Sequence, residues 1–252
     1  MPFVEIQTFQ NKAKVNFLTL STVQTQFQIL DQHPHVMLVH TIRTSDGKFV
    51  KVLEKPNCPI CSNPELKEKF HGPSFRYRVN VLNTTPHKTC PNCGAEYNMY
   101  RGNVARCTSC QADLTNVAAL PINRVEILEK GKTVFTDINQ HCESMEVSNP
   151  NFDIRNLTFM ATQIGTGRDT KVTLTPRTDI PAAPFAGYEL YDLASVGDFD
   201  LSNDEVIALI SGATLSAVLS SRSNSNQQDT PVDYAKSNSP APFDFSGVPG
   251  LS

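Results

Sequence analysis

Six of the seven cysteines in the sequence fall into three Cys-x-x-Cys pairs, and this spacing lets two thiolates face one metal ion. Thirteen residues separate the pair Cys90 and Cys93 from the pair Cys107 and Cys110. A loop of that length can fold back as a hairpin and bring all four thiolates to one tetrahedral ion. We therefore predict a zinc ribbon at 90–110, whose metal is structural because the segment has little core of its own.

The third pair, Cys58 and Cys61, has no further Cys-x-x-Cys pair to complete it. A second zinc at this pair would have to recruit a histidine, and Cys142 is the one spare thiol. The candidate histidine ligands are His40, His71 and His87. In a competing arrangement, Cys58 and Cys61 share an ion with one of the later pairs and leave two cysteines free. The sequence therefore predicts one zinc ion and allows two.

A catalytic role finds little support in the sequence. Cys142 lies in a helix-like segment without an adjacent base, and no Ser-His-Asp, His-Glu-x-x-His or P-loop pattern occurs. Four thiolate ligands leave no open position on a zinc ion for a substrate. The segment 165–169, with two glycines, is typical of a hairpin turn. We predict that the protein is not an enzyme.

The elements that must position the ribbon are predicted to be mainly β-strands. A short helix is expected at 133–145, and the capping-box spacing of Ser202 and Glu205 predicts one more helix over roughly 203–220. Many short strands with one helix between the later ones favour an OB-like small barrel, with the zinc ribbon inserted. Alternation of apolar and polar residues predicts the strands at 25–30, 36–42, 49–54, 75–82, 123–130, 157–164 and 171–176.

The composition of the sequence changes at Pro181. We predict a β-rich body at 1–180 with the ribbon inserted at 83–122, and then a linker and short helix at 181–221. Residues 222–252 are rich in Ser, Asn, Pro and Gln, and we expect a disordered tail because they cannot bury enough apolar surface to offset the ordering entropy.

Charge is divided unevenly between the body and the rest of the chain. Residues 1–180 hold 20 Lys and Arg against 16 Asp and Glu, a net charge of +4. Residues 181–252 hold 2 against 9, a net charge of −7. This asymmetry predicts that the body meets an anion and that the acidic C-terminal part does not.

Two further patterns bear on the compartment. No apolar run approaches the ~20 residues of a membrane-spanning helix. The first residues do not show the basic region, apolar block and cleavage site of a secretory signal. We therefore expect a soluble protein in the cytoplasm, where reducing conditions favour metal binding over disulfides.

The order of several segments resembles a known family. Cys58-Pro-Ile-Cys61 is followed by RYRVNVL (76–82), NRVEILEKGKTVF (123–135), FDI (152–154) and GTGRDTKVTLTP (165–176). Over roughly residues 36–180, this order is similar to the single-stranded DNA-binding proteins of tailed bacteriophages, of the zinc-containing, helix-destabilising type. The chain departs from that pattern where it carries the ribbon at 83–122, since a short hairpin turn would be expected there.

The resemblance implies an OB-type barrel that binds single strands in the host cytoplasm and tolerates any sequence. It also implies that the acidic C-terminal tail recruits replication or recombination proteins. Such binding needs a basic groove for phosphates and aromatic rings on which bases stack. The candidate contacts are Arg76 and Arg78 on the polar face of 75–82, Lys48, Lys51 and Lys55 near the hairpin at 45–47, Arg168 and Lys171 near the last hairpin, and Tyr97, Tyr100, Arg101 and Arg106 on the ribbon.

We therefore predict a sequence-nonspecific single-stranded DNA-binding protein that supports phage DNA replication, recombination and repair. One alternative is a zinc-ribbon module that regulates transcription or binds another protein. A second alternative is a structural protein of the virion or its scaffold, whose tail drives assembly.

Overall fold

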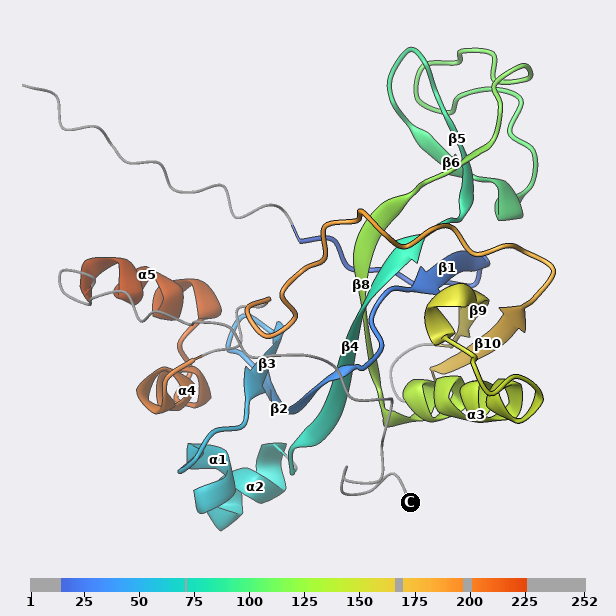
Figure 1. Ribbon diagram of the computed structural model, residues 1–252. Helices are drawn as coiled ribbons and strands as arrows, with labels where there is room; N and C mark the ends of the chain where they lie inside the picture. The colour runs from blue at the N-terminus through green and yellow to red at the C-terminus, as the bar shows by residue number, and fades with distance from the viewer. Residues whose placement is uncertain (1–14, 71, 166–169, 197–200, 226–252) are drawn as a thin grey trace, which may run out of the picture. The chain divides into compact units, whose positions relative to one another are not determined.

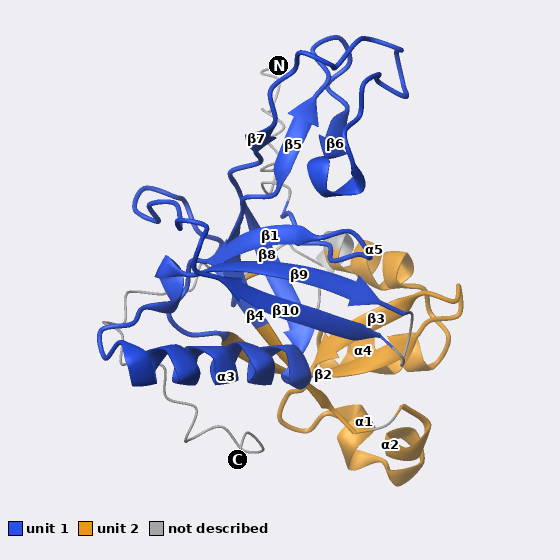
Figure 2. Cartoon of the chain, turned by 90° about the vertical axis from the view of Figure 1, so that its right-hand side faces the viewer, with its two compact units in different colours: residues 1–34, 78–194 blue, residues 35–77, 195–252 orange. Residues whose placement is uncertain are grey.

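The computed structural model describes residues 15–70, 72–165, 170–196 and 201–225. Strands make up 32% of these residues and helices 25%, so the predicted mainly β class is confirmed. The chain divides into two compact units, coloured in Figure 2. Unit 1 comprises residues 1–34 and 78–194, and unit 2 comprises residues 35–77 and 195–252. Each unit is therefore built from two separate stretches of chain, instead of from a body followed by a linker and a tail.

Unit 1 contains an antiparallel sheet with buried apolar side chains. Its strand order is β10-β9-β1-β4, and β8 also pairs with β4, whose first residues belong to unit 2. Phe27 on β1 stacks on Phe159 on β9, with ring centroids 5.8 Å apart and both side chains fully buried. The strands are β1 (Thr25–Ile29), β4 (Ser74–Asn83), β8 (Arg124–Gly131), β9 (Thr158–Ile164) and β10 (Lys171–Arg177).

The strand pairing of the described residues does not close into the small barrel that the sequence predicts. β1 pairs with β4 and β9, which follow much later in the chain. Alternation of apolar and polar residues indicates that a segment is a strand, but it carries no information about the partner strand. The predicted strands are therefore present, whereas their predicted closure into a barrel is not seen.

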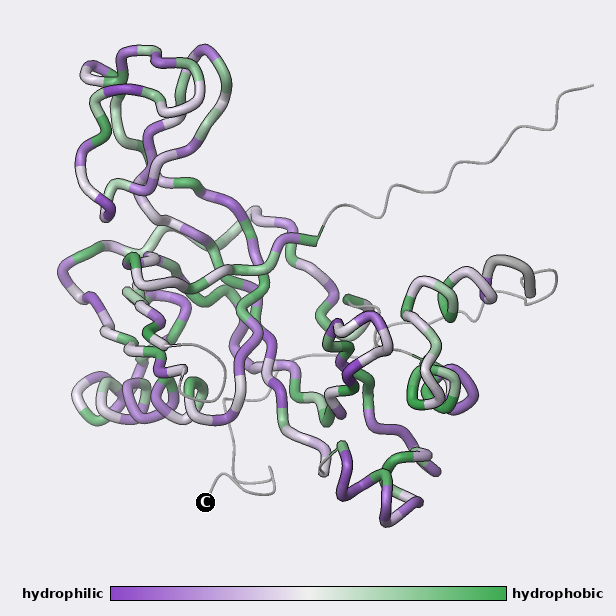
Figure 3. The backbone as a smooth tube through the Cα atoms, turned by 180° about the vertical axis from the view of Figure 1, so that it is seen from behind, coloured by the Kyte–Doolittle hydropathy of each residue, from purple (hydrophilic) through white to green (hydrophobic). Residues whose placement is uncertain are grey.

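Helix α3 (Lys132–Ser148) packs on β8 and β10 in unit 1. Hydrophilic and hydrophobic residues alternate along its turns, as Figure 3 shows. The buried side chains are Val134, Phe135, Ile138 and Cys142. They recur about one helical turn apart, so a single stripe of the helix faces the sheet. A 3-10 turn, η2 (Ile154–Asn156), then leads into β9.

Residues 181–194 cross unit 1 as a bound strap, although the sequence predicts a linker there. The side-chain amide of Gln28 donates to the Ala183 carbonyl and accepts from the Ala183 N–H, each at 2.9 Å. Asn80 forms the same kind of pair with Tyr191, at 3.1 and 2.9 Å. Gln28 and Asn80 are buried, so the strap satisfies polar groups that would otherwise be costly inside the protein.

Unit 2 is built on a hairpin of β2 (His35–Arg43) and β3 (Phe49–Leu53). The predicted turn is confirmed, and Gly47 supplies its positive φ of 79°. Two short helices, α1 (Pro59–Ser62) and α2 (Pro64–Phe70), follow the hairpin. The core combines Ile42, Val50, Val52 and Ile60 with Leu201, Val206, Leu209 and Val218 from the C-terminal part.

Two helices replace the single helix predicted over 203–220. The capping box of Ser202 and Glu205 is present at the start of α4 (Asn203–Ile210). Gly212, with φ of +105°, follows α4, and the chain then begins α5 (Leu215–Ser225). Only glycine adopts such a conformation readily, so the helix ends there. The predicted tail at 222–252 overlaps the end of α5, and its remainder, 226–252, lies outside the described residues.

The ribbon forms a separate three-stranded sheet in unit 1, between β4 and β8 in the chain. Its strand order is β6-β5-β7, and Figure 1 shows it beyond the end of β4. The elements are β5 (Pro86–Thr89), β6 (Glu96–Asn98), the 3-10 turn η1 (Met99–Arg101) and β7 (Leu120–Pro121). Among the described helices, none is both long enough and apolar enough to cross a membrane.

Candidate metal centres and nucleic-acid interface

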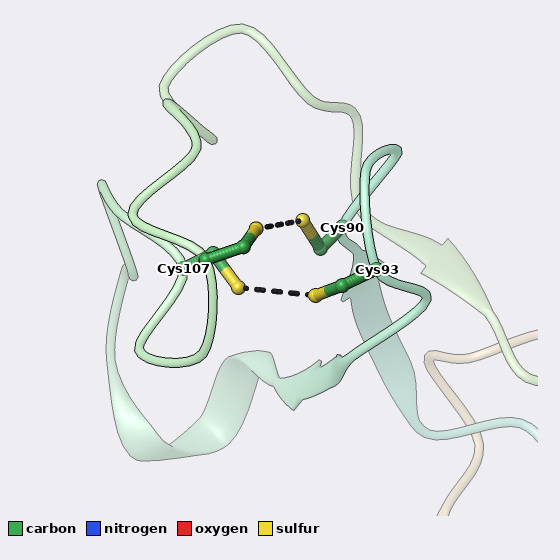
Figure 4. A group of neighbouring side chains, drawn as sticks. Cys90, Cys93 and Cys107 are labelled. Carbon is green, nitrogen blue, oxygen red and sulfur yellow. Dashed lines mark hydrogen bonds between the residues drawn. The ribbon is translucent and has the colours of Figure 1, made fainter.

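Four cysteine thiols gather between two turns of the ribbon, as Figure 4 shows. The Sγ atoms of Cys90 and Cys110 are 3.5 Å apart, and those of Cys93 and Cys107 are 3.4 Å apart. All four Sγ atoms lie within 4.8 Å of one another. Zinc–thiolate bonds of about 2.3 Å place tetrahedral sulfurs roughly 3.8 Å apart, so the group has the size that one ion requires. The predicted four-cysteine cluster is therefore confirmed as a group that could hold a metal.

The two Cys-x-x-Cys turns repeat the same backbone hydrogen bonds. The N–H groups of Cys90 and Cys107 each donate, at 2.8 Å, to the carbonyl five residues further on. The N–H groups of Gly94 and Gln111 donate back to those cysteines' carbonyls at 2.9 Å. Gly94 and Gln111 also both have positive φ, of 72° and 62°. Each turn therefore presents its two sulfurs in the same way, which suits a tetrahedral ion held from two sides.

Tyr97 connects the metal cluster to the rest of the ribbon. Its hydroxyl donates to Cys107 Sγ at 3.1 Å and accepts the Thr108 N–H at 2.8 Å. The hydrogen bond from Tyr97 lowers the pKa of the Cys107 thiol to about 5. Because the thiolate is the form that binds metal, this hydrogen bond favours the metal-binding form of Cys107, whereas contacts with Cys107 and Cys90 raise the pKa of Cys110 to about 12.

A second candidate metal group lies in unit 2. It combines His40 on β2, Cys58 directly before α1 and Cys61 within α1, with ligand atoms within 4.8 Å of one another. His40 Nε2 is 3.1 Å from Cys61 Sγ, and the Cys61 thiol donates to Glu54 Oε1 at 3.3 Å. His40 and Cys58 are buried. Burial and the hydrogen bond to Glu54 raise the pKa of Cys61 to about 12, so a metal must displace a firmly held proton.

The structure distinguishes between the arrangements that the sequence leaves open for Cys58 and Cys61. The later pairs form their own group of four thiols, and His40 is the histidine that joins Cys58 and Cys61. His87 lies in unit 1, where its Nδ1 is 2.9 Å from the Thr85 carbonyl oxygen. Cys142 is buried in α3, away from both groups, and His71 lies outside the described residues.

The prediction that Arg78 lies on a basic, solvent-facing side of β4 is wrong. Its side chain is 2% exposed, and its guanidinium bonds the Glu129 carboxylate at 2.9 Å. Asn80, on the same face, is buried against Asp31. Both faces of β4 are covered over most of its length, so polar residues at alternate positions do not mark an exposed surface here. Arg78 is therefore not available to a DNA strand, while Arg76 is half-buried.

The β2–β3 hairpin of unit 2 carries an exposed aromatic ring that is not among the predicted contact residues. Phe49 is 72% exposed, and the guanidinium of Arg43 lies 6.0 Å from its ring centroid. Arg43 is paired with Phe49 across the hairpin, and Lys51 lies two residues along β3 on the same side. Lys48, at the tip, is exposed and forms a 3.0 Å ion pair with Asp46. We call Arg43, Lys48, Phe49 and Lys51 the hairpin face. The outward position of Phe49 in the alternation at 49–54 is the signal that could have identified it.

The other predicted contact residues are dispersed. Arg101 and Arg106 are exposed on the ribbon, whereas Tyr97 is half-buried. The ring of Tyr100 is also half-buried, and its hydroxyl donates to Gln26 Oε1 at 2.7 Å. Lys171 is exposed at the start of β10, Lys55 is half-buried in unit 2, and Arg168 lies outside the described residues.

Comparison with known proteins gives no relative on which a function could rest. No protein-family model matches the chain, and no curated protein matches it.

Proposed function

We propose that the protein binds single-stranded DNA without sequence preference and acts in phage DNA replication, recombination and repair. The observation that carries the proposal is the hairpin face, where the exposed ring of Phe49 lies among Arg43, Lys48 and Lys51. An exposed phenyl ring on a strand offers a surface for any base, since every base has a π-face, and the neighbouring cations attract the phosphates. The order of sequence segments that resembles phage single-strand binders supports the same proposal.

We further propose that both candidate metal groups bind zinc. Four thiolates in the ribbon match a closed structural site. In unit 2, His40, Cys58 and Cys61 supply three ligands of the types that zinc prefers, and the Glu54 carboxylate is near enough to the Cys61 sulfur to be the fourth. Such ions stabilise the ribbon and unit 2, respectively, and take no part in a reaction.

The proposed setting of this activity is the host cytoplasm. The acidic residues at the C-terminal end are proposed to recruit replication or recombination proteins, as the resemblance to phage single-strand binders implies. No enzymatic step is proposed for either metal group.

The experiment that tests the function is a fluorescence anisotropy titration of labelled oligo-dT with the wild-type protein and with Phe49→Ala. Loss of one stacking ring typically removes about 1–3 kcal/mol of binding free energy. We therefore expect Phe49→Ala to weaken binding at least about fivefold, and Phe49→Trp to restore it because indole offers a larger ring.

Val147→Ala is the matched control. Val147 is 88% exposed on α3, and the substitution shortens another apolar side chain at the surface. It should bind oligo-dT as the wild type does. Equal affinity of the wild type and Phe49→Ala would contradict the assignment of the hairpin face. Absence of wild-type binding would contradict the function itself and leave the protein-interaction and structural alternatives.

A further inference from the structure

A groove of about 520 Å³ lies in unit 1 between the ribbon and the strands from which it projects. One wall comes from the ribbon, with Tyr97 on β6 and Arg101 at the end of η1. The opposite wall is the segment that leads into β1, which contributes Phe17. The volume falls within the ~300–1,000 Å³ that ligand sites commonly have. All of these elements belong to one unit, so the groove is a feature of that unit alone.

Two aromatic rings line this groove. Phe17 is 43% exposed, although it is a large apolar side chain. The guanidinium of the buried Arg78 lies over the Phe17 ring, 5.9 Å from the ring centroid, and this contact holds the ring in place. The ring of Tyr97 is held through its hydroxyl by Cys107 and Thr108, at the second metal-binding turn. Rings fixed in this way lose little conformational entropy when a flat ligand stacks on them.

Apart from Val23, Val104 and Ile122, the remaining lining is polar, and it carries little free negative charge. Glu126 is buried, and its carboxylate accepts from Asn83 Nδ2 at 2.9 Å and from Arg124 Nε at 2.8 Å. This pairing partly neutralises the negative charge of Glu126, which would otherwise repel a phosphate. Arg101 is exposed and adds a cation at the ribbon wall, while Glu96 is the other acid of the lining. Hydroxyl and amide groups fill the space between, from Thr19, Ser21, Thr25, Thr85 and Asn98.

We infer that this groove is a second binding site on the protein, which takes bases of a single-stranded nucleic acid. A base presents a flat face for Tyr97 and Phe17 and an edge of donors and acceptors for the hydroxyl and amide side chains. Its phosphate lies within reach of a flexible arginine such as Arg101. The inference rests on the proposed function and adds a site that does not involve the hairpin face.

The site also gives the ribbon's metal a role in binding. The position of the Tyr97 ring depends on Cys107 and Thr108, and both belong to the turn that a bound metal would fix. Tyr97→Phe keeps the ring and removes the hydrogen bonds of the hydroxyl to Cys107 and Thr108. Tyr97→Ala removes the ring as well. The two variants therefore separate stacking from the tether to the metal-binding turn.

The experiment measures binding of labelled oligo-dT by anisotropy and maps photo-crosslinks from 5-iodouracil-substituted oligo-dT by mass spectrometry. Tyr97→Ala should weaken binding roughly five- to a hundredfold, the range that stacking of one base gives, and Tyr97→Phe should weaken it less. Arg101→Ala should weaken binding more than Arg106→Ala does. Arg106 is the matched control, because it lies on the ribbon but outside the groove lining. Crosslinks should map to Tyr97 or Phe17.

Zinc content per chain is measured for every variant, so that a ribbon that fails to fold is recognised. If Tyr97→Ala loses zinc, then Tyr97→Phe, Arg101→Ala and the crosslink map decide the question. The groove is rejected if these two variants keep their zinc and bind as the wild type does, with crosslinks confined to other peptides. In that case Phe49→Ala can still weaken binding, and the proposed function survives. Absence of wild-type binding rejects both.

Discussion

At the scale of single residues, burial decides which charged side chains can act on a ligand. Arg78 and Glu129 form an ion pair whose side chains are 2% and 6% exposed, and Arg78 Nη1 also donates to the Leu193 carbonyl at 3.5 Å. A buried pair of this kind contributes modestly as a pair, but removing one partner leaves an uncompensated charge. The role of Arg78 is therefore to hold β4, β8 and the strap together within unit 1.

Replacement of Arg78 by methionine tests this structural role. We expect Arg78→Met to lower the free energy of unfolding by about 3–5 kcal/mol, because it strands the Glu129 carboxylate inside unit 1. Lys171→Met is the control, since Lys171 is exposed on β10 and should change stability by no more than about 0.5 kcal/mol. Chemical denaturation followed by circular dichroism measures both. Equal stability of the two variants would show that Arg78 is solvated after all.

At the scale of elements, the sequence identifies strands and Cys-x-x-Cys turns well, because each depends on neighbouring residues. The predicted β1, β3, β4, β8, β9 and β10 lie within a residue or two of their observed bounds. The four-cysteine group is predicted because two Cys-x-x-Cys turns already specify four ligands. The choice of His40 for Cys58 and Cys61 is not predicted, since it depends on how the fold brings His40 on β2 to Cys61, 21 residues further along the chain.

The metal groups make a prediction at this scale. Elemental analysis of the reduced, purified protein should find two zinc ions per chain, because the two groups share no ligand. Cys90→Ser and Cys58→Ser should each remove about one ion and leave the other. Loss of the ribbon ion should expose the ribbon to proteolysis, because zinc binding supplies on the order of 10 kcal/mol to such segments. A zinc content near zero in the wild type would reject both sites.

The pair α4 and α5 gives a second element-scale prediction. Glu205 on α4 is held by Arg222 on α5, at 2.6 Å between Oε2 and Nη2, and this lowers the pKa of Glu205 to about 2. The ion pair therefore stabilises the folded state at pH values above the ordinary glutamate pKa. Its contribution falls as the pH drops toward 2, because the folded state then takes up the proton that the unfolded state has already bound.

Glu205→Gln keeps the capping-box geometry and removes the charge. Because Arg222 is 41% exposed, solvent screens the pair, and we expect a loss of about 1 kcal/mol at neutral pH and almost none near pH 2. Asp204→Asn is the control, since Asp204 is an exposed acid in the same first turn. Urea denaturation across this pH range measures the difference. A loss that does not change with pH would mean that the charge of Glu205 does not contribute.

At the scale of the whole molecule, the sequence predicts a body, a linker and a tail, whereas the structure forms two units that each use distant segments. The C-terminal segment supplies Leu201, Val206, Leu209 and Val218 to the core of unit 2. Its apolar residues predict a helix over 203–220, but the change of composition at Pro181 does not show which core they join. A composition average reports the mean of a segment, but packing depends on individual side chains at the right spacing.

This organisation changes how the acidic C-terminal part can be tested. Deletion from Pro181 would remove the strap and both C-terminal helices, so it would unfold the units instead of isolating a charge effect. Deletion of 226–252 removes three acids, Asp229, Asp233 and Asp244, and one cation, Lys236. If this segment competes with DNA for cations, its loss should tighten binding slightly at low salt. The gain should vanish once salt shortens the Debye length to about 10 Å or less. A gain that persists at high salt would contradict competition by charge.

The central claim, that the protein binds single strands, is tested most directly by competition. Labelled oligo-dT bound to the wild-type protein is challenged with unlabelled single strands of mixed sequence and with the corresponding duplex, over roughly 50 to 200 mM salt. We predict that single strands of any sequence compete well, that the duplex competes at least about tenfold less well because its bases cannot stack on exposed rings, and that affinity falls with salt. Failure of oligo-dT to bind at all, or equal competition by the duplex, would contradict the account.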